Sequence, residues 1–276
     1  MFLRSLVLLT AFIFTAGCGN MGNLSVTQIK EKIKASDEIS KLTKTSDYAA
    51  MEKVYSKDLQ VLVKSLDKDF ALSMNTSITA ALANAKANKE PASEVQVVLK
   101  TLTRVFYLAL SKSLDSAEKT NDLNTKMAEL QKAAAYNTAA GVPAQRRDKT
   151  VKPSPKLEEA LTNAFSALEK SAQAGNKMEF MLQKKVIIDT LNKSYALSVL
   201  FEAEELIKAR NKDPEFVKVK VAEGITYYKI LQGAVVKNSP KSDEIIMNML
   251  AGPAANYDEN VLRSELNKGL GDVKLK

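Results

Sequence analysis

SEVQVVLKTLTRVFYLALSKSLDSAEK, residues 93–119, decides the fold class of this 276-residue chain. Apolar residues recur in it at steps of three and four, which is the period of an amphipathic helix. These apolar residues form two adjacent stripes, and a face of that width predicts a central, largely buried helix. The spacing of Ser93 and Gln96 predicts a capping box at its start. The two stripes are Val95, Val98, Leu102, Val105 and Ala109 beside Leu99, Phe106, Leu110 and Leu114.

The same period continues on both sides of this stretch and predicts further helices. No segment shows a convincing alternation of apolar and polar residues, which a half-buried strand would have. The sequence therefore predicts an all-α fold, either a helical bundle or a short solenoid. The expected helices span 46–68, 76–90, 93–119, 122–140, 155–175, 176–209, 213–236, 245–250 and 258–267.

Residues 143–156 predict a linker that divides the chain into two halves. Three prolines interrupt a basic run in this segment. Proline removes a backbone donor and disfavours the helical region for the residue before it, so we expect an extended conformation. Ser154 and Pro155 then predict the start of the next helix, as its N-cap and its first helical residue.

The two halves, residues 25–142 and 157–276, share an internal similarity. VVLKTLTRVFYL (97–108) aligns with VIIDTLNKSYAL (186–197), and the helices before and after these segments align in the same order. This pattern predicts two duplicated three-helix units, which would have to stack to bury their apolar faces. The alternative is that any two amphipathic helices match at their apolar positions.

The composition excludes several kinds of active site. The chain has no histidine, which excludes Ser-His and Cys-His nucleophiles and histidine-based zinc sites, and its ten glycines form no phosphate-binding loop. We therefore expect no catalytic residue, no metal site and no cofactor. Glu202 and Glu205 lie one helical turn apart and are candidate binding residues; the alternative is a solvated helix face.

Four tyrosines on the predicted central helices are further candidates for ligand binding. They are Tyr107, Tyr195, Tyr227 and Tyr228. A groove between helices can hold a ligand against such rings, and an open cleft beside them would favour this interpretation. The alternative is packing in the core, with each hydroxyl reaching a polar partner.

The formal net charge of +8 does not by itself indicate a nucleic-acid partner. Most of the excess is lysine spread along helix faces, with glutamate and aspartate between. We expect either plain solvated charge or an attraction to lipid head groups or cell-wall polymer.

The first 18 residues predict export. Arg4 precedes an apolar run from Leu6 to Phe14, and the sequence TAGC (15–18) follows it. This is the layout of a secretory signal with a cleavage site of small residues. The apolar run is shorter than the roughly 20 residues that a membrane-spanning helix needs. Cys18 is the only cysteine, and lipidation explains it better than a free thiol in an oxidising compartment.

This amino terminus resembles that of bacterial lipoprotein precursors. The resemblance implies that residues 1–17 are a signal peptide, that Cys18 carries lipid, and that residues 18–24 form a short tether. Gly19, in place of the Asp associated with retention in the inner membrane, implies anchoring in the outer membrane, facing the periplasm.

From this expected localisation and the absence of a catalytic motif, we expect a binding or scaffold protein without catalytic activity. Its expected partners are the membrane, through the lipid, and an envelope protein; a nucleic acid is not expected. The alternative is a solute-binding accessory lipoprotein of a transport system, with a small molecule between the halves.

Overall fold

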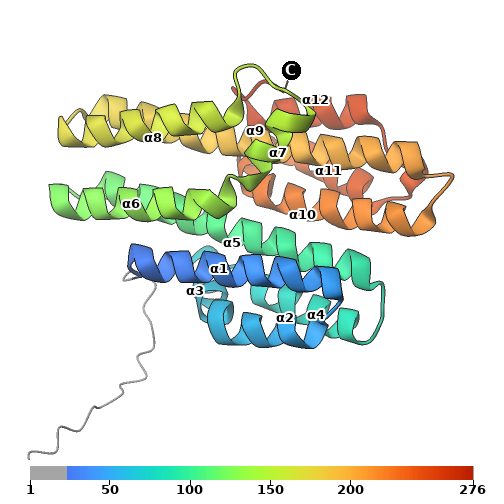
Figure 1. Cartoon of the computed structure of the whole chain (residues 1–276). Helices are drawn as coiled ribbons and strands as arrows, with labels where there is room; N and C mark the ends of the chain where they lie inside the picture. Colours follow the sequence, from blue (N-terminus) through green and yellow to red (C-terminus); the bar gives the residue numbers. More distant parts are fainter. Residues whose placement is uncertain (1–23, 276) are drawn as a thin grey trace, which may run out of the picture.

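The structure, a computed structural model, describes residues 24–275, and that range contains helices and no strand. The predicted all-α fold is therefore confirmed. The predicted signal peptide and Cys18 lie outside the described residues, so lipidation stays a prediction. Figure 1 shows long helices packed side by side along the whole described chain.

The helices follow one another with short connections. In the N-terminal half they are α1 (Val26–Leu42), α2 (Tyr48–Val54), α3 (Gln60–Phe70), α4 (Met74–Lys86), α5 (Pro91–Lys119) and α6 (Leu123–Ala140). Beyond it they are α7 (Val142–Thr150), α8 (Leu157–Gln173), α9 (Lys177–Ala209), α10 (Pro214–Asn238), α11 (Pro240–Ala251) and α12 (Glu259–Leu270).

Local capping chemistry explains why three of these helices begin where the sequence predicts. The side chains of Asp122, Asn176 and Asp213 accept hydrogen bonds from backbone N–H groups in the first turns of α6, α9 and α10. Such bonds satisfy donors that have no partner inside the helix. Each cap lies within three residues of the group it serves, so sequence spacing alone is enough to find it.

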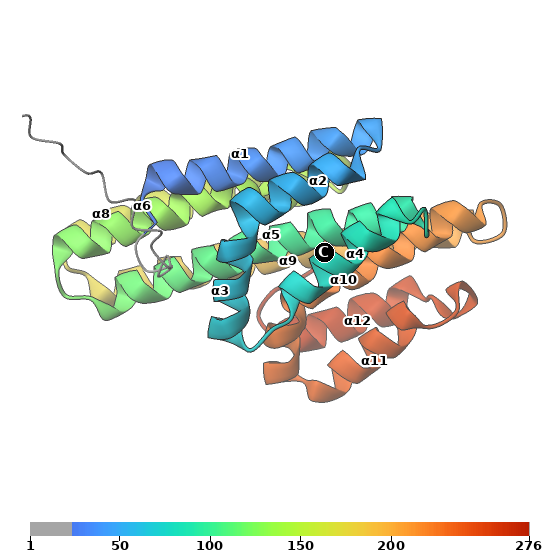
Figure 2. The ribbon, with the colours of Figure 1, turned by 90° about the horizontal axis from the view of Figure 1, so that it is seen from below.

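The two longest helices organise the packing. α5 contacts α4, α6 and α10, whereas α9 contacts α7, α8 and α10. α10 therefore joins the two halves, and one hydrophobic core runs through both. Figures 1 and 2 show the α5–α6 and α8–α9 hairpins side by side, with their turns at the same end of the molecule. A common origin of the two halves stays a prediction.

The predicted start of the central helix is wrong by two residues. α5 begins at Pro91, with Glu90 as its N-cap, and the Ser93 side chain makes no capping hydrogen bond. Proline has a preset φ and lacks the N–H that the first helical turn leaves unpaired, so Pro91 starts the helix two residues before Ser93. Gln96 instead accepts a hydrogen bond from Lys100.

The predicted linker is also corrected, because most of residues 143–156 are not extended. Residues 142–150 form α7, with Pro143 in the first turn, where a missing N–H costs nothing. Ser154 and Pro155 do not open the next helix, since α8 begins at Leu157. Its first two N–H groups donate to the carboxylate of Asp148, at 2.8 and 2.9 Å. The cap thus comes from the preceding helix.

The single helix expected over 46–68 is interrupted. A five-residue π-helical turn, η3 (Tyr55–Leu59), separates α2 from α3, and Figure 2 shows the two helices running in different directions. The hydroxyl of Tyr55 donates to Asn75 at 2.9 Å, which ties the turn to α4. A π-helical turn is where a helix changes its register or its direction, so the apolar pattern continues through a bend.

The contact between α10 and α12 leaves no space for a larger residue at Gly269. A Cβ added there would lie 2.6 Å from the side chain of buried Val235. We expect Gly269→Ala to lower the free energy of unfolding by about 1–3 kcal/mol, because overpacking forces α12 outward. Gly233→Ala is the matched control: it is helical, exposed and open around its Cβ, and should stabilise the protein by up to about 1 kcal/mol. Equal urea midpoints for the two variants would contradict this prediction.

Candidate functional site

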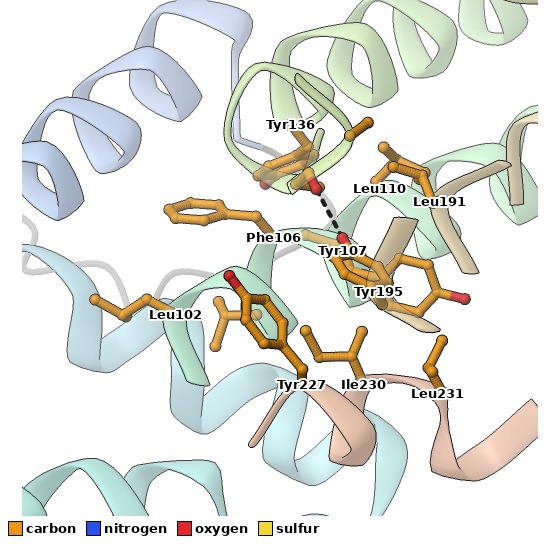
Figure 3. Packing of buried hydrophobic residues seen from close by; sticks show 14 of the residues in the cluster. Leu102, Phe106, Tyr107, Leu110, Tyr136, Leu191, Tyr195, Tyr227, Ile230 and Leu231 are labelled. Atoms are coloured by element: carbon orange, nitrogen blue, oxygen red, sulfur yellow. Dashed lines mark hydrogen bonds between the residues drawn. The ribbon is translucent and has the colours of Figure 1, made fainter. Parts of the chain in front are cut away.

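The predicted tyrosines Tyr107 and Tyr195 lie in the core and not at a cleft. Their rings meet edge to face, with 5.5 Å between centroids (Figure 3). The Tyr107 hydroxyl donates to Asn192 at 3.0 Å, and the Tyr195 hydroxyl donates to the backbone carbonyl of Ala140 at 2.8 Å. Burial raises the pKa of Tyr107 to about 12. These contacts are those of core tyrosines with satisfied hydroxyls.

The other two tyrosines also have partners within the protein. The Tyr228 hydroxyl donates to the carboxylate of Asp243 at 2.8 Å, which joins α10 to α11. The ring of Tyr227 lies 5.1 Å from the ammonium group of Lys100, a cation–π contact. Both tyrosines are buried. Packing and a hydrogen bond therefore account for Tyr228. Tyr227 is held by packing and by the cation–π contact, and it also lines a hollow of about 290 Å³ beside Lys100 and Glu223.

Four charged side chains form a buried ion network between α5, α9 and α10. Lys100 lies 3.0 Å from Glu223, and Lys220 bridges Glu223 and Glu202 at 2.8 and 2.7 Å. Lys100, Glu202 and Glu223 are all at most 7% exposed. Removing such charges from water is costly, and the cost is offset only when each charge keeps its partner. The network therefore fixes the positions of these helices relative to one another.

The two carboxylates of this network differ in their electrostatic surroundings. Burial, together with the negative charge of Glu223, raises the pKa of Glu202 despite the hydrogen bond from Lys220. Burial acts in the same direction on Glu223, but the charges and hydrogen bonds of Lys100 and Lys220 outweigh it and lower the pKa of Glu223. Glu223 is thus the better stabilised anion.

Glu202 and Glu205 do not form the pair that their spacing suggests. Glu202 points into the buried network, whereas Glu205 lies 3.1 Å from Lys208 at the surface. The two side chains are therefore engaged by different cations, Glu202 in the interior and Glu205 at the surface.

Arg147 is a buried cation next to this network. Its guanidinium carbon lies 4.0 Å from the centroid of the Phe201 ring, and the side chain is 5% exposed. Burial lowers its pKa, whereas the charge of Glu202 opposes that shift. The stacking of Arg147 on Phe201 connects α7 to α9, so the predicted linker segment belongs to the packed interior.

A half-open groove of about 630 Å³ runs between α5 and α10. We call it the α5/α10 groove. Because α5 and α10 come from different halves, both halves build the site. Its volume lies in the range of roughly 300–1,000 Å³ that is typical of small-molecule sites. The residues that line its long walls are Val97, Thr101 and Arg104 from α5, and Val221, Ile225 and Lys229 from α10.

The cations Arg104 and Lys229 are functional candidates that sequence reasoning missed. They lie at the same end of the groove, and burial lowers the pKa of Arg104. The sequence carried no signal for them, because Arg104 lies on the helix face opposite the two predicted apolar stripes, where a charged residue is ordinary.

The comparisons with known proteins give no relative for this chain. No protein-family model, no curated protein and no solved structure matches it significantly. Among residues 24–275, no helix combines the length and the apolarity needed to cross a membrane. That part of the chain also holds no group of three or more acidic, histidine or cysteine side chains arranged to bind a metal ion.

Proposed function

We propose that the chain is an exported, lipid-anchored helical binding protein on the periplasmic face of the outer membrane. The signal-like segment and Cys18 support export and lipid anchoring, and the α5/α10 groove supports binding. The groove is the observation that carries the proposal, because its walls come from both halves and its volume suits a ligand. The protein acts by binding, without catalysis of its own.

In the first form of this function, the protein is a scaffold for an envelope protein. A half-open groove along two long helices can receive an extended segment of a partner, and the buried ion network keeps those helices in place. Anchoring through more than one acyl chain on Cys18 would hold the scaffold stably at the bilayer.

In the second form, the protein is a solute-binding accessory lipoprotein of a transport system. The volume of the groove and the two cations at one end of it favour this form. The core between the halves, where Tyr107 meets Tyr195, is filled with side chains, so in this form of the function the solute would lie in the groove and not among these rings.

A photo-crosslinking residue in place of Val97, on the groove wall, tests the proposal in intact cells. We expect an adduct that is absent when the same residue replaces Val61, which is 61% exposed on α3 and outside the groove. A protein-sized adduct identifies a scaffold, and a small mass increase identifies a solute. Identical products at both positions, or none at position 97, would contradict binding in the groove.

Lipid anchoring at the outer membrane is tested in the same cells with the variant Cys18→Ser. We expect the wild-type chain to fractionate with the outer membrane and mass spectrometry to find acylated Cys18 at its amino terminus. Cys18→Ser should leave the membrane fraction. A bare thiol or an unprocessed start in the wild-type protein would refute the lipid anchor, whatever the crosslinking shows.

A further inference from the structure

Two positive side chains at one end of the α5/α10 groove have no partner among residues 24–275. Arg104 comes from α5 and Lys229 from α10, and both line the groove. Neither makes an ion pair or a hydrogen bond within that range, and the Nε atom of Arg104 is buried without an acceptor. Most buried polar groups in proteins are hydrogen-bonded, so the buried Nε atom of Arg104 requires an explanation, and the exposed Lys229 adds a second positive charge beside it.

The acidic residues around the groove are already engaged elsewhere. Asp67 accepts the backbone N–H groups of Met74 and Asn75, at 2.7 and 2.8 Å. Glu94 accepts from Asn84 at 2.9 Å. Asp67 attracts Arg104 from a distance without reaching it.

At the far end of the groove, Glu90 lies 3.0 Å from Lys218, which also contacts Glu215. That end of the groove is therefore neutralised by its own ion pairs. The positive charge near Arg104 and Lys229 has no such compensation.

The two cations also repel each other. Partial desolvation in the groove lowers the pKa of Lys229, and the positive charge of Arg104 lowers it further. An anion placed between the two side chains would attract both and relieve this repulsion, and its hydrogen bonds to them would be charge-assisted.

The groove beside the cations is apolar. Val97 on α5 faces Val221 and Ile225 on α10, and Leu72 and Met74 extend this surface toward α4. We propose that the groove binds a small amphipathic anion, with its carboxylate or phosphate head between Arg104 and Lys229 and its apolar chain along Val97, Val221 and Ile225. This inference rests on the proposed use of the groove for binding and names the class of ligand.

The test is a calorimetric titration of the full mature chain carrying Cys18→Ser, which needs no detergent. The probes are decanoate and decyl phosphate below their micelle concentrations, octyl glucoside as an uncharged amphiphile, and inorganic phosphate as a head group without a chain. Decanoate or decyl phosphate should bind at least tenfold more tightly than octyl glucoside and inorganic phosphate. Whichever of the two anions binds more tightly identifies the head group.

Arg104→Gln and Lys229→Gln should each weaken binding of the charged amphiphiles by about tenfold, the usual effect of losing one charge-assisted hydrogen bond. Lys218→Gln is the matched control, since it lies on α10 in the same groove but is paired with Glu90. The affinity of Lys218→Gln for the charged amphiphiles should stay within about twofold of that of the wild type. Lys229 is exposed, so Lys229→Gln remains informative even if Arg104→Gln fails to fold.

Three results would overturn the inference: no binding of either charged amphiphile, equal binding of octyl glucoside, or unchanged affinity in Lys229→Gln. A protein adduct at position 97 together with no binding of decanoate or decyl phosphate would refute the ligand class and leave the scaffold function standing. If the chain binds these anions but proves not to be lipidated, only the proposed lipid anchor and localisation are refuted.

Discussion

Replacing Glu223 by alanine is expected to lower the free energy of unfolding by about 3–5 kcal/mol at neutral pH. The substitution removes the shared partner of Lys100 and Lys220 and leaves Lys100 buried without a carboxylate. The measurement is urea unfolding followed by circular dichroism, where the midpoint should fall at an unchanged slope. A loss below about 1 kcal/mol would contradict the role given to the network.

Glu202→Gln is the matched control for this prediction. The raised pKa of Glu202 means that folding disfavours its charge, and Lys220 keeps Glu223 as a partner when that charge is removed. We therefore expect a change within about 1 kcal/mol. The double substitution Lys100→Met with Glu223→Met should recover much of the loss, because an apolar pair of similar size avoids the desolvation cost of the ions.

The pH dependence of the Glu223 effect has a definite sign. Folding lowers the pKa of Glu223, so its contribution to stability is fully present above the unfolded-state pKa of about 4.3 and is lost as the pH falls through the folded-state value. The stability difference between wild type and Glu223→Ala should be constant from pH 7 to 5 and shrink below pH 4. A difference that grows under acid would show that the sign is wrong.

Tyr195→Ala is expected to lower the free energy of unfolding by about 3–5 kcal/mol. Tyr195 is fully buried on α9 and packs edge-on against Tyr107 of α5, so truncation leaves a cavity between the halves. Tyr195→Phe isolates the hydroxyl. It leaves the buried carbonyl of Ala140, in the last turn of α6, without a donor, at a cost of about 1–3 kcal/mol.

Chemical denaturation of both Tyr195 variants measures these two contributions separately. Tyr48→Phe is the control, since this half-buried tyrosine of α2 makes no hydrogen bond through its hydroxyl within residues 24–275. It should change the stability by less than about 0.5 kcal/mol. If Tyr195→Phe proves as stable as wild type, the hydroxyl does not help to join α6 to α9.

Helix content and several helix ends could be predicted because their causes are local. The spacing of apolar residues in residues 93–119 depends on the period of one helix, and Asp122 and Asn176 cap helices through groups at most three residues away. The error at Ser93 has a local cause as well. Two start signals lay within three residues, and the fixed φ of Pro91 prevailed.

The candidate site could not be predicted because its members are far apart in sequence. Lys100 and Glu223 are 123 positions apart, and Arg104 and Lys229 are 125 apart; in each case α5 and α10 must first pack together. The cap of α8 shows the same limit on a smaller scale, since Asp148 reaches Leu157 only after the intervening residues turn back. A cysteine-poor, histidine-free composition excludes chemistries, but it does not tell which charges meet.

The sequence by itself therefore determined the all-α class, several helix boundaries and the apolar faces, because backbone hydrogen bonding and side-chain periodicity act within a few residues. Only the tertiary structure decided which charges are buried as pairs, which tyrosines fill the core, and where Arg104 and Lys229 stand without partners. These outcomes depend on distances between helices. Such distances result from the packing of whole apolar faces against one another, so they cannot be predicted from the spacing of residues along the chain.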